Sequence, residues 1–343
     1  MNSNWQDFLL AAGARIENQQ LVHFDSPQQE ILAAQNGSIL TDLSHFSVVQ
    51  FAGEDSEAFL QGQVSCDVRQ ATLAQARLGS YCTPKGRMLA TFLLWRSAEG
   101  FFMQLPAPLR EAIQKRLTMY VMRSKVKVSD ASEQTIRLGI AGQAAFAALA
   151  ELGGTAPEDD YAVARCGAVT AIRLPGQRFE LLVAPDNAAA VWQILSRHCT
   201  PVGSGCWEWL EIQAGIPMVT AATQEQFVPQ MANMELIGGV SFTKGCYPGQ
   251  EIVARSQYLG KVKRRMYRAR LQSDAAPQPG DVLFGQGPSE QSGGMVVNAQ
   301  PAPDGGFDLL AVILNSSIES GAVHWKTPDG PVLKLLSLPY AVE

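Results

Sequence analysis

Four side chains with useful chemistry lie within the eight residues from 244 to 251, which read KGCYPGQE. Lys244 supplies an ammonium, Cys246 a thiol, Tyr247 a phenol and Glu251 a carboxylate. A thiol beside a cation and near the start of a helix loses its proton readily, and the thiolate is the reactive form. The segment therefore predicts a catalytic site in which Cys246 reacts, Lys244 stabilises the thiolate or binds an anion, and Glu251 restrains Lys244.

The backbone of this segment is expected to form a tight turn followed by a helix. Gly245 and Gly249 can adopt positive φ and are expected to serve the geometry of the turn only, while Pro248 fixes its own φ. No further glycine or proline interrupts residues 250 to 257, so a helix is predicted there, with Cys246 just before its positive end. The residues alone leave one alternative open, a glycine-rich joint between domains with a buried cysteine.

The composition limits the class of protein. A chain of 343 residues is long enough for two or three subdomains, and 46% hydrophobic and 17% charged residues are typical of a globular protein. The net charge of −5 argues against a protein that coats nucleic acid by neutralising phosphates. The first ten residues, MNSNWQDFLL, lack the features of a secretion signal, and no run of residues approaches the roughly 18 apolar side chains that would cross a bilayer. We therefore expect a cytoplasmic protein without membrane contact.

The cysteines and histidines do not form a ligand set. The six cysteines include no Cys-x-x-Cys pair, and the four histidines do not cluster. No metal site is therefore predicted, and reduced thiols are the expected state in the cytosol.

The hydrophobic pattern predicts two α+β segments followed by an all-β segment. In the first segment, strands at 45–51, 77–83, 88–95 and 101–105 alternate with helices at 54–61 and 108–122. In the second, strands at 137–140, 169–174 and 178–183 alternate with helices at 144–152, 187–197 and 206–214. After residue 261, short strands separated by turns predict a small barrel or sandwich. We therefore expect three domains, at residues 1–130, 131–258 and 259–343.

Five blocks of sequence, in this order along the chain, resemble those of the YgfZ proteins, folate-binding relatives of the glycine-cleavage T protein, an aminomethyltransferase. They are QGQVSCDV at 61–68, PKGR at 84–87, AGIP at 214–217, FVPQ at 227–230 and KGCYPGQE at 244–251. The resemblance runs from about residue 38 to residue 267. It implies an α+β fold with two ferredoxin-like lobes of the T-protein folate-binding type and a C-terminal all-β barrel, arranged as a ring around a folate channel.

The same resemblance implies a function. It points to a folate-binding accessory protein that supports iron–sulfur cluster enzymes and thereby tRNA modification. The cofactor would be tetrahydrofolate or a derivative, and the partners would be iron–sulfur client enzymes, including those that thiolate tRNA, while direct tRNA binding is not expected. The alternative is a folate-dependent one-carbon transferase or demethylase that acts on an unidentified small molecule.

Three residues are implied by the resemblance to contact folate. Trp207 occupies a family position associated with folate, Phe46 stands where the family has a second tryptophan, and Gln213 replaces the glutamate that holds the pterin edge in T proteins. A phenyl ring can stack but cannot donate, and an amide forms hydrogen bonds without negative charge. Without the resemblance, Phe46 and Trp207 are equally well explained as ordinary core aromatics.

The segment that supplies the catalytic aspartates of aminomethyltransferases reads GRMLAT here, at residues 86–91. No acid remains at either position. We therefore do not expect an active glycine-cleavage aminomethyltransferase.

A basic stretch follows the predicted helix at 250–257. Its six cationic side chains are Lys261, Lys263, Arg264, Arg265, Arg268 and Arg270. The simpler interpretation is one solvated face of a strand. The alternative is a docking site for a polyglutamate tail, a client protein or tRNA phosphates.

Overall fold

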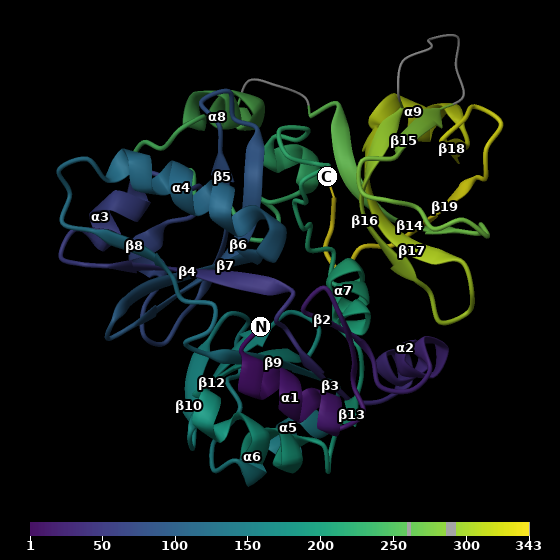
Figure 1. The fold of residues 1–343 in the computed structure, drawn as a ribbon. Helices are drawn as coiled ribbons and strands as arrows, with labels where there is room; N and C mark the ends of the chain where they lie inside the picture. Colours follow the sequence, from purple (N-terminus) through teal and green to yellow (C-terminus); the bar gives the residue numbers. More distant parts are fainter. Residues whose placement is uncertain (259–261, 286–292, 343) are drawn as a thin grey trace. The chain divides into compact units, whose positions relative to one another are not determined.

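The computed structural model describes residues 1–258, 262–285 and 293–342 (Figure 1). Contacts between residues divide the chain into two compact units. Unit 1 comprises Met1–Ser56, Arg69–Arg77 and Leu93–Leu210, and unit 2 comprises Glu57–Val68, Leu78–Phe92 and Glu211–Glu343. The chain passes from one unit to the other several times, so each unit is assembled from separate stretches of sequence.

Unit 1 contains the larger share of the α+β elements. Its helices are α1 (Ser3–Ala11), α2 (Pro27–Asn36), α4 (Arg110–Val121), α5 (Ala144–Glu151), α6 (Pro185–Leu195) and most of α7 (Ser204–Gln213), with the 3-10 turns η1 (Val68–Gln70) and η2 (Ala107–Leu109). Its strands are β1 (Arg15–Glu17), β2 (Gln20–His23), β3 (Ile39–Asp42), β4 (Phe46–Ala52), the end of β6 (Met88–Ser97), β7 (Gly100–Pro106), β8 (Lys127–Asp130), β9 (Ile136–Ala141), β10 (Val163–Cys166), β11 (Val169–Leu174), β12 (Arg178–Val183) and β13 (Thr200–Pro201).

Unit 2 contains the remaining elements. They are α3 (Ser56–Gln61), β5 (Arg77–Cys82), the start of β6, η3 (Pro229–Ala232), α8 (Gln250–Tyr258), β14 (Arg264–Leu271), β15 (Val282–Gly285), β16 (Gly294–Pro301), β17 (Phe307–Leu314), α9 (Asn315–Ser320), β18 (Val323–Trp325) and β19 (Leu333–Leu336).

One sheet of unit 1 has the strand order β10-β11-β12-β9-β3-β13. Strand β3 lies antiparallel beside β9, with Leu40 opposite Ile140, so distant segments of the chain share the centre of the sheet. Because side chains alternate along a strand, Phe179, Leu181 and Val183 of β12 point to one face. Helices α1, α5 and α6 lie together on one face of the sheet and bury a common apolar core (Figure 1).

A second sheet in unit 1 is centred on β4. Strand β4 pairs antiparallel with β7 on one side and β8 on the other, and residues 93–97 of β6 continue the sheet beyond β7. Helix α4 packs against β4 and β8 and buries Ile113 and Leu117, which lie one turn apart on the same face.

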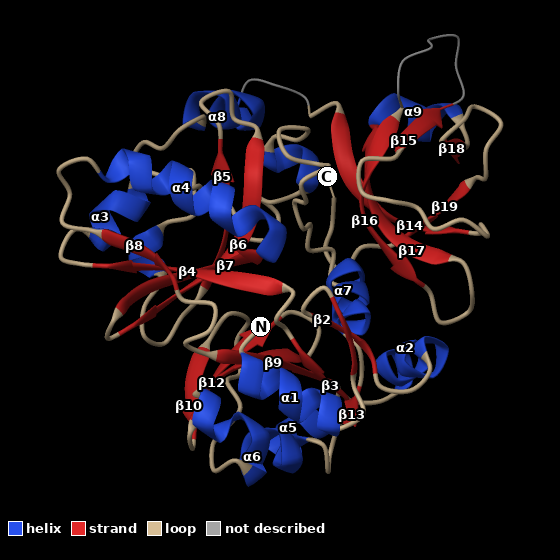
Figure 2. Cartoon of the chain, viewed as in Figure 1, coloured by secondary structure: helices blue, strands red, loops and turns tan. Residues whose placement is uncertain are grey.

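The C-terminal part of unit 2 is an antiparallel sheet with the order β18-β15-β16-β17-β14-β19 among the described residues. A bridge between His324 of β18 and Val332, next to β19, joins its two edge strands. Figure 2 shows these strands curving around one another, with α9 at one end, and their apolar side chains form a core of their own. The sheet therefore meets itself at its edges, as a barrel requires.

The predicted α+β character is confirmed. Helices α3 to α8 lie within a few residues of the predicted positions, whereas α1, α2 and α9 were not predicted. The three domain limits and the ring arrangement stay predictions. No helix of the described residues is both long and apolar enough to span a membrane.

Candidate functional site

The segment from 244 to 251 lies in unit 2, and Gly249 fixes its turn. Gly249 has φ +85°, and a Cβ atom there would lie 2.5 Å from the carbonyl oxygen of Thr83 and 2.6 Å from Cα of Gly86. The turn at 84–87 therefore packs directly against the segment, and only glycine permits this approach. Gly245 has no positive φ, and a Cβ atom there would meet open space, so the structure gives no backbone reason for glycine at 245.

Lys244 is buried and holds the segment to the block at 61–68. Its side chain is 5% exposed, and Nζ donates to the carbonyl oxygens of Val64 at 2.5 Å and Cys66 at 2.9 Å. The ammonium also lies 5.2 Å from the centre of the Tyr247 ring. These contacts satisfy a buried charge and give Lys244 a structural role, because an unpaired ammonium would be expensive to bury.

Glu251 does not restrain Lys244. Its carboxylate is exposed at the start of α8 and accepts a hydrogen bond from Arg255, one turn later, at 2.7 Å. This expectation is wrong because the Lys244 side chain enters the interior while Glu251 faces solvent.

Tyr247 is also buried, and its hydroxyl oxygen has no hydrogen-bond partner in the described residues. Burial raises the pKa of the phenol, and the neighbouring Cys82 and Cys66 thiols raise it further. Tyr247 therefore stays protonated at neutral pH and cannot serve as a general base.

Cys246 differs from every other cysteine of the chain. It is exposed, whereas Cys66, Cys82, Cys166, Cys199 and Cys206 are buried, and all six are free thiols. Burial raises the pKa of Cys82 and Cys206 to about 12 and that of Cys199 to about 11. The alternative of a buried cysteine at 246 is therefore wrong, and this thiol is the one that reagents and partners can reach.

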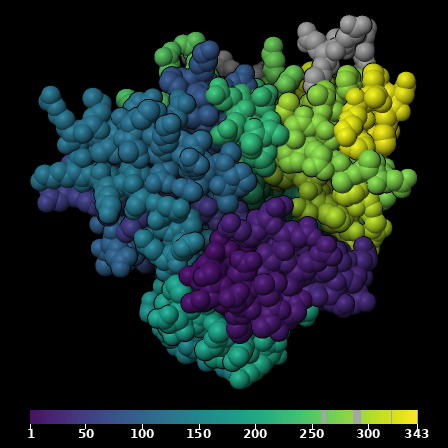
Figure 3. Space-filling view, in the orientation of Figure 1, coloured from purple at the N-terminus to yellow at the C-terminus, as the bar shows by residue number. Residues whose placement is uncertain are grey.

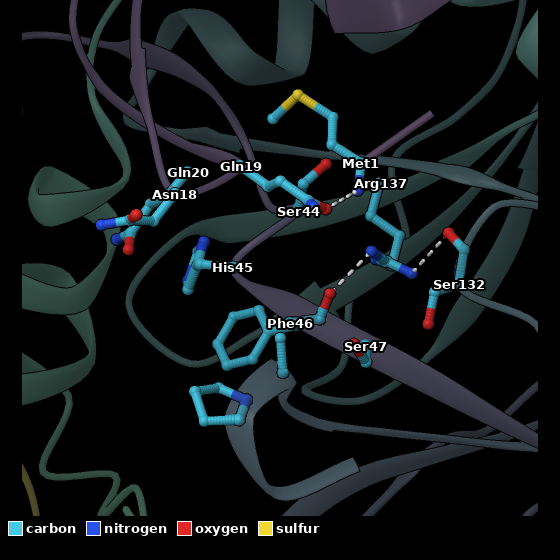
Figure 4. Close-up of a pocket in the computed structure, with 12 residues that line it drawn as sticks. Met1, Asn18, Gln19, Gln20, Ser44, His45, Phe46, Ser47, Ser132 and Arg137 are labelled. Atoms are coloured by element: carbon cyan, nitrogen blue, oxygen red, sulfur yellow. Dashed lines mark hydrogen bonds between the residues drawn. The ribbon is translucent and has the colours of Figure 1, made fainter. Parts of the chain in front are cut away.

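A cavity of about 270 Å³ lies in unit 1 beside Phe46, the predicted aromatic wall of the folate site (Figure 4). Phe46 begins β4, and its ring lies 4.1 Å from the ring of His45. The other residues that line the cavity are Met1, Asn18, Gln19, Gln20, Ser44, Ser47, Ala107, Pro108, Ser132 and Arg137. The cavity thus combines an aromatic face with amide, hydroxyl and cationic groups.

The charge in this cavity comes from Arg137 of β9. Its guanidinium donates to the carbonyl oxygen of Phe46 at 2.8 Å and to that of Ser132 at 3.4 Å (Figure 4). Both ring nitrogens of His45 are buried without a partner in the described residues. Burial, and secondarily the charge of Arg137, lower the pKa of His45 to about 3, so the imidazole is neutral at pH 7.

Trp207 lies in the core of unit 1. Its side chain is 1% exposed, the backbone of Gly139 approaches one edge of the indole, and the Arg178 guanidinium lies 5.1 Å from the ring centre. This is the environment of a core aromatic, and the ring does not line the cavity beside Phe46. Contact between Trp207 and folate stays a prediction.

Gln213, the predicted pterin-edge residue, belongs to unit 2, and both ends of its amide are engaged. It donates to Asp308 of β17 at 3.0 Å and accepts a hydrogen bond from Arg268 of β14. Asp308 also accepts two hydrogen bonds from Arg270, at 2.6 and 3.2 Å. Within unit 2, Gln213 is therefore tied to the C-terminal sheet through β14 and β17.

These contacts also change the interpretation of the basic stretch. Arg268 and Arg270 belong to the network around Gln213, and Arg265 pairs with Glu235 and donates to the carbonyl oxygen of Gln230 at 3.0 Å. A single solvated face is therefore wrong for these three arginines. Lys261 lies outside the described residues.

Neither His45 nor Arg137 was predicted from the sequence to belong to the site. Arg137 stands in an apolar strand between Ile136 and Leu138, and a charge at a buried strand position is itself a signal. No group of three or more potential metal-binding side chains occurs among the residues that the structure describes.

Comparison with known proteins finds a matching family model, relatives with similar sequences and a solved structure with a similar fold. A family model described as the GCVT N-terminal domain matches residues 17–242. A protein of Enterobacter sp. (strain 638) named tRNA-modifying protein YgfZ is 33% identical over 92% of this chain and 98% of its own length. The protein of the same name from Escherichia coli O127:H6 is 32% identical over the same shares.

The structure resembles the glycine cleavage system aminomethyltransferase T of Bartonella henselae. The TM-score is 0.78 with 17% sequence identity, and the match covers 99% of this chain and 97% of that one. At this level of identity the similarity establishes a shared fold, and it shows that the chain has the mixed α+β fold of T proteins.

Proposed function

The chain belongs to the YgfZ family of tRNA-modifying proteins, and from this membership we propose that it is a folate-binding accessory protein that supports iron–sulfur enzymes and, through them, tRNA modification. The cofactor is tetrahydrofolate or a derivative. The partners are iron–sulfur client enzymes, including those that thiolate tRNA.

The exposed Cys246 is the observation that carries this proposal. Its loop is held by Gly249 and by the buried Lys244, so an accessible thiol sits on a rigid frame. A reachable thiol on such a frame can lose its proton and contact a client cluster transiently, because thiolates are the protein ligands of such clusters.

The cavity beside Phe46 supports the folate part of the proposal. Phe46 offers a stacking face and Arg137 a positive charge, while His45 is neutral and keeps both ring nitrogens buried. Its volume of about 270 Å³ is just below the range of small-molecule sites, about 300–1,000 Å³. It therefore suits a flat heterocyclic head group, with the rest of the ligand extending outward.

The residues at 86–91 support a role other than glycine cleavage. Arg87 donates to the carbonyl oxygen of Gln226 at 2.6 Å, and the Thr91 hydroxyl accepts the backbone N–H of Val219 at 3.1 Å. Met88, Leu89 and Ala90 are buried. This strand therefore carries packing and backbone contacts in place of a carboxylate.

Titration with tetrahydrofolate, followed by tryptophan fluorescence, tests the folate part. We expect saturable binding in the wild type, weaker binding in Phe46→Leu, and recovery in Phe46→Trp, which restores an aromatic face. Equal binding by all three proteins would contradict a stacking role for Phe46. Consumption of an amine substrate coupled to tetrahydrofolate would instead favour a one-carbon transferase or demethylase.

Complementation tests the thiol part. Cys246→Ala is expected to abolish tRNA thiolation in cells that lack the natural protein, while circular dichroism and thermal unfolding stay unchanged because the side chain is exposed. Gly245→Ala, one residue away in open space, is the matched control and is expected to complement fully. Full complementation by Cys246→Ala would refute the role of the thiol.

A further inference from the structure

The C-terminal end of α4 carries an exposed apolar cluster. Met119, Tyr120 and Met122 lie within four residues of one another and are 65%, 47% and 87% exposed. Single exposed apolar side chains are ordinary, but three of them within four residues are a reason to look for an interaction site. We refer to Met119, Tyr120 and Met122 as the α4 patch.

The fold does not account for this cluster. Helix α4 packs on its sheet through Ile113 and Leu117, which are fully buried. The α4 patch adds nothing to that packing, because its side chains point away from the sheet into solvent. The segment around α4 lies at the surface on the face shown in Figure 3.

Backbone strain at Met122 is a second, independent observation. Met122 ends α4 with φ 46° and ψ −102°, a region in which glycine is normally required. A side chain in such a conformation costs about 1–3 kcal/mol, and it persists only where something else offsets the cost. The backbone that follows is held within unit 1, where the amide of Ser124 donates to the carbonyl oxygen of Val121 at 2.8 Å and that of Lys125 to the Asp55 carboxylate at 2.7 Å, while the Met122 side chain itself is left exposed.

The border of the α4 patch is positively charged. Lys115 precedes Met119 by one turn, Arg116 precedes Tyr120 by one turn, and Arg123 follows the patch. None of these three cations forms an ion pair in the described part of the chain, and Nε of Arg116 is buried without a hydrogen-bond partner. The nearby Lys125 is already paired with Glu54 at 2.7 Å. The three cations therefore give the α4 patch a positive border, although the chain as a whole has a net charge of −5.

We propose that the α4 patch is a docking surface for a partner protein whose own surface has an apolar centre and an acidic border. Methionine, tyrosine and arginine are enriched where proteins meet, whereas lysine belongs at the rim. Two of the three residues of the α4 patch are methionines, and methionine has no complementary interaction with phosphates. A protein therefore fits this surface better than RNA does. The inference is separate from folate binding and from Cys246.

Site-specific photocrosslinking in living cells tests the proposal. A photoreactive amino acid is placed at Tyr120 of the full chain, and in a second protein at the exposed Gln193 of α6 as the control position. We expect a discrete protein adduct from position 120 and none from position 193. The adduct should decrease at least tenfold when Met119→Ser and Met122→Ser, or Lys115→Glu and Arg123→Glu, are introduced.

The captured protein then has to satisfy the charge argument. With that protein purified, binding should weaken as salt rises, and changing acidic residues at its crosslinked surface to lysine should restore binding to the Lys115→Glu, Arg123→Glu protein. An adduct removed by ribonuclease would replace the protein partner with RNA. An adduct with a second copy of this chain, or no discrete adduct at position 120, would overturn the proposal.

Discussion

At the scale of single residues, the two glycines at 245 and 249 behave differently. We expect Gly249→Ala to lower the free energy of unfolding by about 2 kcal/mol or more, because φ is +85° and the new Cβ would clash with backbone atoms of residues 83 and 86. Gly245→Ala should change it by less than about 0.5 kcal/mol. Urea unfolding measures both, and similar values for the two variants would show that the turn at 84–87 does not pack as described.

His45 predicts a pH dependence. Its pKa is about 3 in the folded protein and about 6.5 when exposed, so below pH 6.5 the unfolded chain takes up a proton that the folded chain does not. Stability is therefore retained above pH 6.5 and falls as the pH drops toward 3, by up to about 1.4 kcal/mol per pH unit. Unfolding curves between pH 7 and 5 measure this slope, which His45→Gln should reduce. An unchanged slope in that variant would mean that His45 is protonated in the folded state.

At the scale of elements, periodic helices could be predicted and pairings between distant strands could not. The spacing of apolar residues located α4 and α6, whereas α2 was not predicted although Pro27 at its first position and Glu30 in its first turn are signals of a helix start. Nothing in residues 39–42 indicates that β3 pairs with β9, because that pairing depends on the whole sheet. The partners of the basic stretch also come from distant parts of the chain, which is why its interpretation as one solvated face was wrong.

The register of β14 and β17 places Arg270 opposite Asp308. Asp308 is buried and also accepts a hydrogen bond from Gln213, so removal of its charge would leave Arg270 without its partner. We expect Asp308→Asn to destabilise the protein by roughly 2–4 kcal/mol. Glu54→Gln removes an exposed pair with Lys125 and should cost less than about 1 kcal/mol. If the two variants unfold at the same urea concentration, the network around Gln213 does not support the C-terminal sheet.

At the scale of the whole molecule, the sequence was enough to locate the candidate site but not to predict which of its side chains are buried. The segment at 244–251 could be found because its residue types are rare together, and Phe46 could be found through the family resemblance. The burial of Lys244 and Trp207 could not be predicted, because both depend on backbone segments far away in the sequence, Val64 and Cys66 for one and Gly139 for the other.

The two units offer different places for a folate, and ligand-dependent protection can distinguish them. A ligand at 100 times its Kd stabilises the folded state by about 2.7 kcal/mol, which slows hydrogen exchange where opening exposes the site. Because the cavity beside Phe46 belongs to unit 1, we expect tetrahydrofolate to protect the residues around β1, β2 and the start of β4. Mass-spectrometric hydrogen exchange with and without the ligand measures this. Protection confined to the residues around Gln213 in unit 2 would instead assign the pterin to the network of Arg268 and Asp308.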